Sequence, residues 1–264
     1  MIEFSELLQA VIDNWEVVVL FFLVAILYSS VGFGGGSSYL AILALTGMSF
    51  IQFRAISLLC NIVVVSGGTY IYFKNGFFNW KKIIPLAILS IPFAFLGGYL
   101  KIGQTFFFVI LGFTLIVAAM SMWISKYIVD SPKQGTHKSV IKDGFIGSVI
   151  GFISGMVGIG GGVFLAPLLH LTNWDTPKRI AATASFFILV NSVAGLLGQY
   201  QSRSIGTDFY FEPNIAFVLM LTVFLGGQIG SRLSASKISP YVLKRITAVL
   251  IAFVGLRILY NHLF

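Results

Sequence analysis

The sequence predicts an all-α integral membrane protein with two inverted-topology repeats, each a glycine-tipped broken-helix hairpin followed by three transmembrane helices. Composition is the first of three observations behind this fold class. Of 264 residues, 57% are hydrophobic and 10% are charged, whereas soluble domains carry about 25% charged residues. The second observation is a series of long apolar segments, and the third is a glycine-rich motif that occurs once in each half.

Seven or more apolar segments alternate with short polar stretches, and most approach the ~20 residues that a helix needs to cross a bilayer. Pro177 follows Thr176, and Pro240 follows Ser239, a pattern typical of the first turn of a helix behind a capping hydroxyl. Tryptophans lie near segment ends, as interfacial aromatics do: Trp15, Trp80, Trp123 and Trp174. The segments run roughly over residues 15–47, 54–73, 83–100, 104–125, 144–171, 178–200, 214–235 and 240–262.

Charge and cysteine content narrow the class of protein further. The first 16 residues are acidic and lack the basic start of a cleaved signal peptide, so we expect no removable leader. The net charge of +8 comes from Lys and Arg between apolar segments, where they set membrane orientation, and it predicts no nucleic-acid partner. A single cysteine, Cys60, excludes an intrachain disulfide and makes a cysteine metal site implausible.

The two halves of the chain are related by an internal duplication. "VGFGGGSSYLAILAL" (31–45) and "VGIGGGVFLAPLLHL" (157–171) agree at 7 of 15 positions with a shift of 126 residues. The same shift superposes Ala55 on Ala181, Ser57 on Thr183 and Ser66 on Ser192, and "FLGG" at 95–98 recurs at 224–227. Three blocks in the same order argue against coincidence. The predicted organisation is therefore an N-terminal repeat (1–125), a linker (126–143) and a C-terminal repeat (144–264).

The positive-inside rule decides whether the glycine segments cross the membrane or turn back. If residues 15–47 and 144–171 each cross once, the basic residues divide 8 against 9. If each segment turns at its glycines and leaves by the face it entered, the division is 13 against 4. The second arrangement predicts re-entrant hairpins in the inner (plasma) membrane, with a cytoplasmic 126–143 linker and both termini outside.

Helix geometry agrees with a hairpin that stops midway. The leg from Ser37 to Gly47 has 11 residues and rises about 16 Å, half of a hydrocarbon core of about 30 Å. A returning hairpin plus three crossings gives each half an odd number of crossings, so the halves must be inverted. The tips at 32–36 and 158–162 should then approach each other near the midplane.

Such tips have a chemical meaning, because non-helical backbone at membrane depth must be buried in protein or line a cavity. Glycines permit the positive φ values that direct successive N–H groups into one concavity, and the following half-helices point their positive dipole ends there. Two converging ends make an anion site. The alternative is that small residues only allow close helix packing, which is the preferred interpretation for "FLGG".

The chain resembles the sulfite exporter TauE/SafE family of membrane transporters. The resemblance rests on "VGFGGG", "VGIGGGVFLAPLL" and "RIAATASFFILVNSVAG", and it covers nearly the whole chain. It implies export of sulfite, sulfoacetate or a related organosulfur anion. The usual Thr-Ser pair is here Thr183 followed by Ala184, and Ala41 stands in the first half where the second has Pro167.

Neutral donors on the helices after each hairpin complete the candidate site, because they can replace the water shell of an anion without trapping it. Ser66 and Ser192 are further hydroxyls on these helices, although such groups also bridge helices or bond their own backbone. Arg54 and Arg179 begin the two helices and could draw anions to the mouths, but a boundary arginine that snorkels is commoner. The predicted substrate-binding residues are Gly34, Gly35, Gly36, Ser37, Ser57, Asn61, Gly160, Gly161, Gly162, Thr183 and Asn191.

The residues that the sequence lacks limit the mechanism. All nine acids lie at segment ends or in loops, so a buried carboxylate proton relay is disfavoured and potential-driven uniport is the working hypothesis. The sequence shows no nucleophile, acid pair or metal cluster of the kind that an enzyme would need, and we expect neither a cofactor nor a metal. The partners expected are a small inorganic or organosulfur anion and membrane lipid. An anion channel, a transporter of another small anion or of a cation, and a scaffolding subunit remain alternatives.

Overall fold

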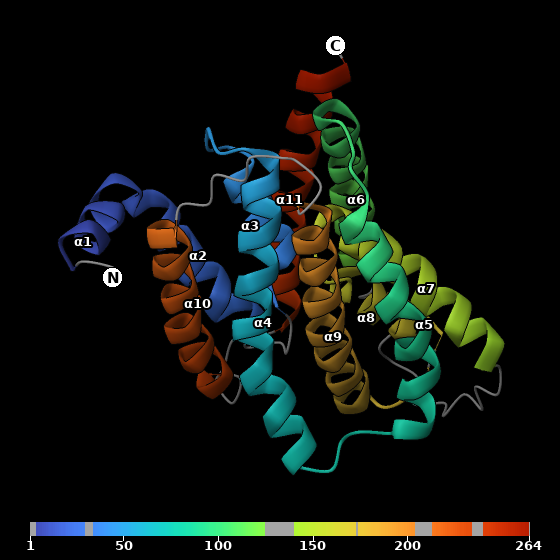
Figure 1. Ribbon diagram of the computed structural model, residues 1–264. Helices are drawn as coiled ribbons and strands as arrows, with labels where there is room; N and C mark the ends of the chain where they lie inside the picture. The colour runs from blue at the N-terminus through green and yellow to red at the C-terminus, as the bar shows by residue number, and fades with distance from the viewer. Residues whose placement is uncertain are drawn as a thin grey trace.

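The computed structural model describes residues 4–29, 34–124, 140–172, 174–203, 213–233 and 240–263, and its regular elements there are 11 α-helices (Figure 1). The first half contributes α1 (Phe4–Asp13), α2 (Trp15–Ser29), α3 (Gly36–Leu43), α4 (Phe50–Lys74), α5 (Trp80–Tyr99) and α6 (Gln104–Ile124). The second contributes α7 (Val140–Val157), α8 (Gly162–Leu171), α9 (Pro177–Arg203), α10 (Pro213–Leu233) and α11 (Pro240–Leu263).

The helices follow the apolar segments that the sequence marks. The segments 15–47 and 144–171 are each broken at their glycines, into α2 and α3 and into α7 and α8, and we call these pairs hairpin one and hairpin two. Three long helices follow each hairpin. Helices α9 and α11 begin at Pro177 and Pro240, as the prolines predict. The end of the predicted linker is helical, because α7 starts at Val140, whereas residues 125–139 lie outside the described ranges.

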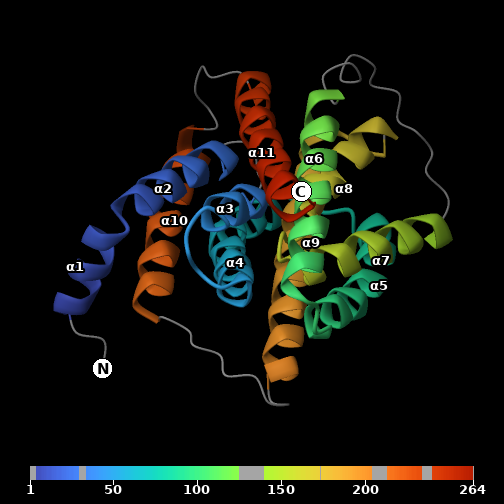
Figure 2. The same cartoon turned by 90° about the horizontal axis from the view of Figure 1, so that it is seen from above.

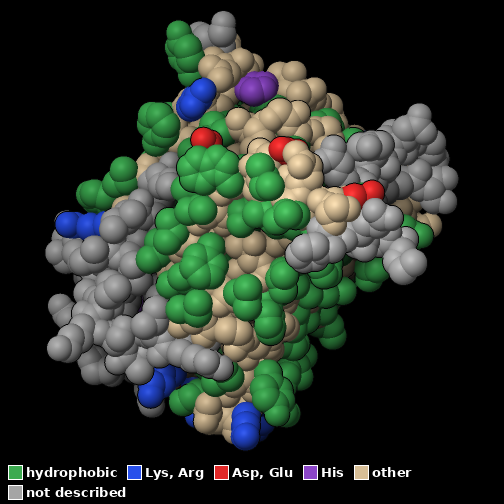
Figure 3. Space-filling model, turned by 90° about the vertical axis from the view of Figure 1, so that its left-hand side faces the viewer, with side chains coloured by type: hydrophobic (Ala, Val, Ile, Leu, Met, Phe, Trp, Pro, Cys, Tyr) green, Lys and Arg blue, Asp and Glu red, His purple; other side chains and the backbone are tan. Residues whose placement is uncertain are grey.

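The chain is a multi-pass membrane protein. Six helices are long and apolar enough to cross a bilayer by length and composition, and a bent pair, α1 with α2, makes up to seven in the described residues. The six are α4, α5, α6, α7, α9 and α10. In Figure 3 hydrophobic side chains cover a broad part of one face, with Lys and Arg towards its margins. Such a surface suits contact with lipid tails.

Helix α1 is an element that the apolar segments did not predict. It meets α2 at 83° and packs against α10, where the Asn214 side-chain amide donates to the Glu6 carboxylate at 3.2 Å. Leu8 and Ile12 are both about half exposed on it. Its ten residues are too few to cross a bilayer, which is why a search for long apolar runs passes over it.

Corresponding helices of the two halves run antiparallel at the centre of the molecule. Leu58, early in α4, lies beside Gly195 of α9, while Thr69 near the end of α4 hydrogen-bonds Ser185 near the start of α9, with 2.9 Å between hydroxyl oxygens. Helices α6 and α11 also lie side by side (Figure 2). They meet at Gly112 and Gly255, where a Cβ added to either would lie 3.1 Å from the other's carbonyl oxygen.

The remaining contacts between halves come in matched pairs. Helix α5 packs against α7 and α9 of the second half, and its counterpart α10 packs against α2 and α4 of the first. The "FLGG" glycines make these approaches possible, since a Cβ at Gly98 would run into the carbonyl of Gly195 and one at Gly226 would lie 2.8 Å from the carbonyl of Phe22. These glycines therefore serve close packing, as predicted.

The two ends of hairpin two lie next to each other. Trp174, just after α8, donates its indole N–H to the carboxylate of Asp143 in the first turn of α7, at 3.4 Å. Trp174 is fully buried, so it packs within the protein, and its expected depth at the membrane interface stays a prediction. The reason for its burial is local: the Lys82 ammonium lies 5.0 Å from the indole centroid and Asp143 satisfies the indole N–H. The other three tryptophans are 42–60% exposed.

Candidate functional site at the hairpin tips

The glycines of both tips adopt backbone conformations that other residues rarely take. Gly35 and Gly161 occupy the same place in the repeated motif, and each is the N-cap of a half-helix with φ of 90° and 82°. Gly158 and Gly160 also have positive φ, at 92° and 80°. Side chains with a Cβ are strained in this region. The sequence predicted such φ values, although α3 begins at Gly36 and ends at Leu43, before the expected Gly47.

The two tips touch each other and helix α4. The Ser57 hydroxyl lies 3.1 Å from the carbonyl oxygen of Gly36 and 3.0 Å from that of Gly158, so one side chain bridges both hairpins. The Asn61 side-chain amide donates to the carbonyl of Ile159 at 2.9 Å. A Cβ at Gly36 would lie 2.6 Å from the same Ile159 oxygen. Bare glycine backbone is therefore needed for this contact.

Arg54 belongs to the same stripe of α4 as Ser57 and Asn61. Their spacing of three and then four residues places them on one helix face. The Arg54 guanidinium donates to the carbonyl of Gly155 at 3.3 Å, and the side chain is only 4% exposed. The snorkelling that we expected of Arg54 as the commoner case is therefore wrong. Sequence alone could not show this, because α7 and its turn cover the start of α4.

Buried polar atoms without partners surround the tips. Among the described residues, the hydroxyls of Tyr39, Ser154 and Ser192 are buried and form no hydrogen bond. A Cβ at Gly35 would lie 3.0 Å from the Tyr39 hydroxyl, and one at Gly160 would lie 2.8 Å from the Ser192 hydroxyl. The Cβ of Ser154 would lie 3.3 Å from a Cβ at Gly161. Buried polar groups normally have partners, so these hydroxyls mark a place that a polar ligand or water can fill.

Two further unpartnered atoms belong to the α4 stripe, the Nε of Arg54 and the Oδ1 of Asn61. The Asn61 oxygen would lie 2.6 Å from a Cβ at Gly34. Sequence reasoning named Asn61 and discussed Ser192, but it missed Tyr39 and Ser154. Tyr39 lies three residues after Gly36 and Ser154 lies four residues before Gly158, and this nearness to the glycine motifs is the only signal that could have identified them.

The other predicted residues are buried, but their donors are in use. Ser37 lies 3.4 Å from the Tyr28 hydroxyl within hairpin one. Thr183 donates to the Arg179 carbonyl at 2.8 Å, and the Asn191 amide donates to that of Phe187 at 2.8 Å, both within α9. Ligand binding by these three residues stays a prediction. Ser66 is exposed and bonds its own helix, so the structure does not bring it to the tips.

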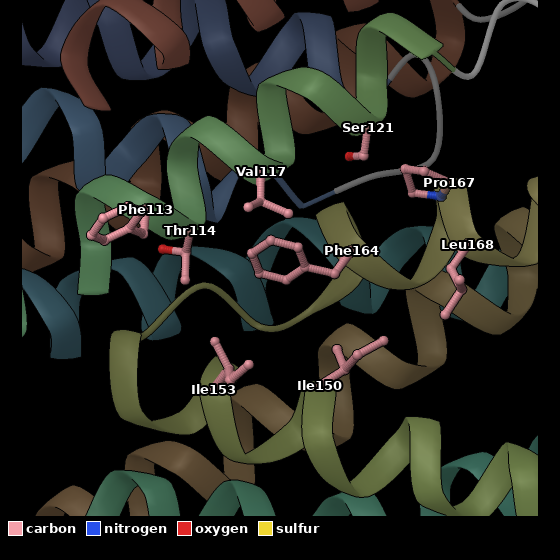
Figure 4. A pocket seen from close by; sticks show the side chains of 9 residues that line it. All are labelled: Phe113, Thr114, Val117, Ser121, Ile150, Ile153, Phe164, Pro167 and Leu168. Atoms are coloured by element: carbon pink, nitrogen blue, oxygen red, sulfur yellow. The ribbon is translucent and has the colours of Figure 1, made fainter. Parts of the chain in front are cut away.

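A separate cavity of about 390 Å³ lies behind hairpin two, between α6, α7 and α8 (Figure 4). Figure 4 shows Phe164 of α8 between Val117 of α6 and Ile153 of α7. The cavity is lined by Phe113, Thr114, Val117, Ser121, Ile150, Ile153, Phe164, Pro167 and Leu168. Both hydroxyls in this lining donate to carbonyls of their own helix. The walls are thus apolar and offer little to an anion.

An ion-pair network anchors the exit of hairpin two. The Asp175 carboxylate lies 3.0 Å from the Lys82 ammonium at the start of α5 and 3.7 Å from the Arg179 guanidinium. Burial alone would raise the pKa of Asp175, but the Thr176 backbone N–H, Lys82 and Arg179 together hold that pKa below its ordinary value. This network fixes the hairpin base to another helix. Within the described ranges, no group of three or more His, Cys, Asp or Glu could hold a metal.

Long apolar helices and glycine-broken helix pairs that meet at buried polar groups define the class of polytopic membrane transporters. Comparison with known proteins places the chain within that class. A family profile described as "Sulfite exporter TauE/SafE" matches residues 17–258, and the chain therefore belongs to the TauE/SafE family. This is a family of transporters, not of enzymes.

Relatives with similar length support the assignment. The probable membrane transporter protein y4hK of Sinorhizobium fredii is 34% identical over 92% of this chain and 96% of its own length. A probable membrane transporter protein of Methanocaldococcus jannaschii is 26% identical over 90% of this chain and 92% of its own length. YunE of Bacillus subtilis, also described as a probable membrane transporter protein, is 24% identical over 79% of this chain and 80% of its own length. No solved structure matches the chain at a significant level.

Proposed function

We propose that this transporter exports a small anion, most simply sulfite or an organosulfonate, by alternating access around the point where the two hairpin tips meet. The observation that carries the proposal is the contact of the two glycine tips at Gly36 and Ile159. Each tip leads into a half-helix capped by left-handed Gly35 or Gly161, beside buried hydroxyls that lack partners in the described residues. The family name supplies the sulfite-type substrate as a starting point.

The packing supports two inverted repeats, residues 1–125 and 144–264, joined by a linker at 126–143. Equivalent helices α4 and α9 run antiparallel, as do α6 and α11. Helix α5 of the first half packs on α7 of the second, and the equivalent helix α10 of the second half packs on α2 of the first. Such a pseudo-two-fold relation would place the tips near the bilayer midplane. The excess of Lys and Arg would place the linker in the cytoplasm and both termini outside the plasma membrane.

The polarity of the tips supports an anion rather than a cation. Donors on α4 occupy the carbonyl oxygens of Gly155, Gly158 and Ile159, and these are the groups that a cation would need. The first N–H groups of a helix have no partner within it, and they carry its partial positive charge. Unpartnered hydroxyls beside them add further donors. An oxyanion with three acceptor oxygens would satisfy this set.

Export of an anion needs no coupling ion in principle. An inside-negative membrane potential favours the exit of each negative charge by about 2.3 kcal/mol per 100 mV. The described long apolar helices carry no Asp or Glu other than Asp143, which lies at the base of hairpin two and accepts the Trp174 indole N–H. We therefore favour uniport driven by the potential.

Flux in proteoliposomes tests this function. Vesicles loaded with sulfite should release it faster through the purified protein, and an inside-negative potassium diffusion potential should increase the rate. The test variant is Ser57→Ala, which removes the hydroxyl that bridges both tips and should therefore slow sulfite release. Sulfite release that ignores the potential but requires a proton gradient would contradict uniport. Single-channel currents in planar bilayers would show that the protein conducts as a channel and would rule out alternating access. The absence of flux with every sulfur oxyanion would overturn the proposal.

A further inference from the structure

Arg54 stands out among the buried groups because its charge has no counter-charge among the described residues. Both ion pairs of the described residues involve Asp175, with Lys82 and with Arg179, and no described carboxylate lies within 4.0 Å of Arg54. Its contacts are one carbonyl, of Gly155, and the ring of Phe107, whose centroid lies 5.6 Å from the guanidinium carbon. The Nε is buried without a partner.

An unpaired guanidinium is an unfavourable group to bury. Removing a charge from water costs several kcal/mol unless an opposite charge and hydrogen bonds compensate. A lysine could respond by losing its proton, but arginine keeps its charge in proteins. One carbonyl and one aromatic ring occupy only part of the five N–H donors and supply no net negative charge. A diffusible anion is the partner that the described part of the chain does not provide.

The position of Arg54 connects this unmet charge to the tips. Its Cα, Cβ and carbonyl oxygen would lie 3.2–3.3 Å from a Cβ at Gly158. One turn further along α4, Ser57 bonds the Gly158 carbonyl at 3.0 Å. The backbone of Arg54 therefore borders the glycine turn that precedes α8, and its guanidinium reaches the Gly155 carbonyl at the end of α7, just before that turn.

We propose that Arg54 is the fixed positive charge of the substrate site, and that its guanidinium pairs with the transported oxyanion at the tip of hairpin two. This inference rests on the proposed anion transport and adds its electrostatic determinant. The other reading is that Arg54 only neutralises the carbonyl end of α7, where Gly155 lies in the last turn. That role would affect stability but not the response to anions.

Arg179 offers a matched control. It lies in the first turn of the counterpart helix α9, but it is 46% exposed at the side chain and already pairs with Asp175. The experiment measures thermal unfolding of the purified protein in detergent over a titration of sodium sulfite, at ionic strength held constant with sodium gluconate. It compares the wild type with Arg54→Gln, Arg54→Lys and Arg179→Gln, and dimethyl sulfone serves as the uncharged probe.

Sulfite should raise the unfolding temperature of the wild type and of Arg179→Gln to the same extent, and dimethyl sulfone should not. Arg54→Gln should weaken sulfite binding by about thirtyfold or more, because one partner of a buried charge pair is lost. Arg54→Lys should bind with intermediate affinity, because it keeps the charge but loses the planar fork. Equal sulfite affinity in the wild type and Arg54→Gln would overturn the role of Arg54 while leaving the proposed transport in place.

Two further outcomes are decisive. If no sulfur oxyanion stabilises the wild type, the proposed function itself fails. If Arg54→Gln does not yield folded protein, Arg54→Lys decides: sulfite affinity reduced about tenfold, as for a weakened bidentate contact, supports the pairing, and unchanged affinity overturns it.

Discussion

The two hairpins share a sequence motif, but they are embedded differently. In hairpin one, every residue of α3 is buried. In hairpin two, Phe164 and Leu168 of α8 are partly exposed and face the apolar cavity. Pro167 lies between them where hairpin one has Ala41. A proline within a helix removes one backbone hydrogen bond, so α8 is less firmly built than α3.

The contacts that hold the tips differ as well. Hairpin one is held by its own side chains: the Tyr28 and Ser38 hydroxyls are 2.9 Å apart, and Phe21 stacks on Tyr39 with centroids 4.6 Å apart. The turn of hairpin two is held by Ser57 and other α4 donors from the opposite half. The comparison teaches that the motif sets the backbone of the turn, whereas the surrounding helices decide how firmly it is held.

The largest expected effect is a substitution of the left-handed glycine of hairpin two. Gly161→Ala should lower the free energy of unfolding by about 2–4 kcal/mol, because it combines strain at positive φ with a crowded site, where the new Cβ would lie 2.9 Å from Phe187. Gly35→Ala should match it, since its Cβ would lie 2.9 Å from Tyr39. Denaturant unfolding measures both.

Gly76→Ala is the control for strain alone, because Gly76 has φ of 69° and nothing within 4 Å of an added Cβ. It should lose only about 1–2 kcal/mol. Wild-type stability in Gly161→Ala would show that the tip geometry is wrong. A much smaller loss in Gly35→Ala would show that hairpin one can relax and that the two tips are not equivalent.

Removal of the bridge between the hairpins should have the next largest effect. Ser57→Ala leaves the carbonyls of Gly36 and Gly158 without this partner and should lower the free energy of unfolding by about 1–2 kcal/mol. Ser66→Ala, on the same helix but exposed and bonded to Val63, should change stability little. The two variants are compared by thermal unfolding in one detergent. Equal losses of stability in the two variants would show that the Ser57 bridge does not stabilise the protein.

Acid should loosen the base of hairpin two. The pKa of Asp175 is held below its ordinary value in the folded protein, so the stability from its ion pairs is fully present above the unfolded pKa of about 3.9. It is lost as the pH falls from there through the lower pKa of the folded state. Asp175→Asn should therefore reduce the free energy of unfolding at pH 7 by under about 1 kcal/mol after solvent screening, which is measured as a lower unfolding temperature. The difference from wild type should shrink below about pH 4. A difference independent of pH would contradict an electrostatic role.

The smallest effect should come from the cavity behind α8. Val117→Leu adds one methylene group at its wall and should stabilise the protein by about 0.5 kcal/mol, while slowing sulfite flux if α8 moves into this space. Val117→Ala should do the reverse. Unfolding and flux of both variants are measured in the same lipid. No change in either would mean that lipid already fills the cavity and that α8 does not use it.

Much of the fold could be predicted from the sequence, because lipid exposure makes apolar runs long and glycine breaks visible. The helix breaks at the glycines, the long helices and the packing role of "FLGG" all followed from local patterns, whereas re-entry of the two pairs from opposite faces stays a prediction. Helix α1 and the burial of Trp174 did not, since ten residues are too few to form a membrane-spanning apolar run, and Asp143 lies 31 positions from Trp174 in the chain.

The candidate site was predictable only in part, for a physical reason. Positive φ at Gly35 and Gly161 follows from the motif itself. Which donors remain unsatisfied depends on neighbours distant in sequence: Ser57 and Asn61 bond carbonyls of the other half, and Arg54 is buried by α7, which begins 86 residues later. A helix-start arginine has the same local sequence whether it snorkels or is buried.

The most direct test of the central claim is an experimental structure of the protein in lipid with bound sulfite. The account predicts density for one oxyanion within hydrogen-bonding distance of the backbone N–H groups at Gly160 to Gly162, with the Arg54 guanidinium as its counter-charge and both tips at the bilayer midplane. Sulfite bound elsewhere, or tips that lie at the water boundary, would contradict it.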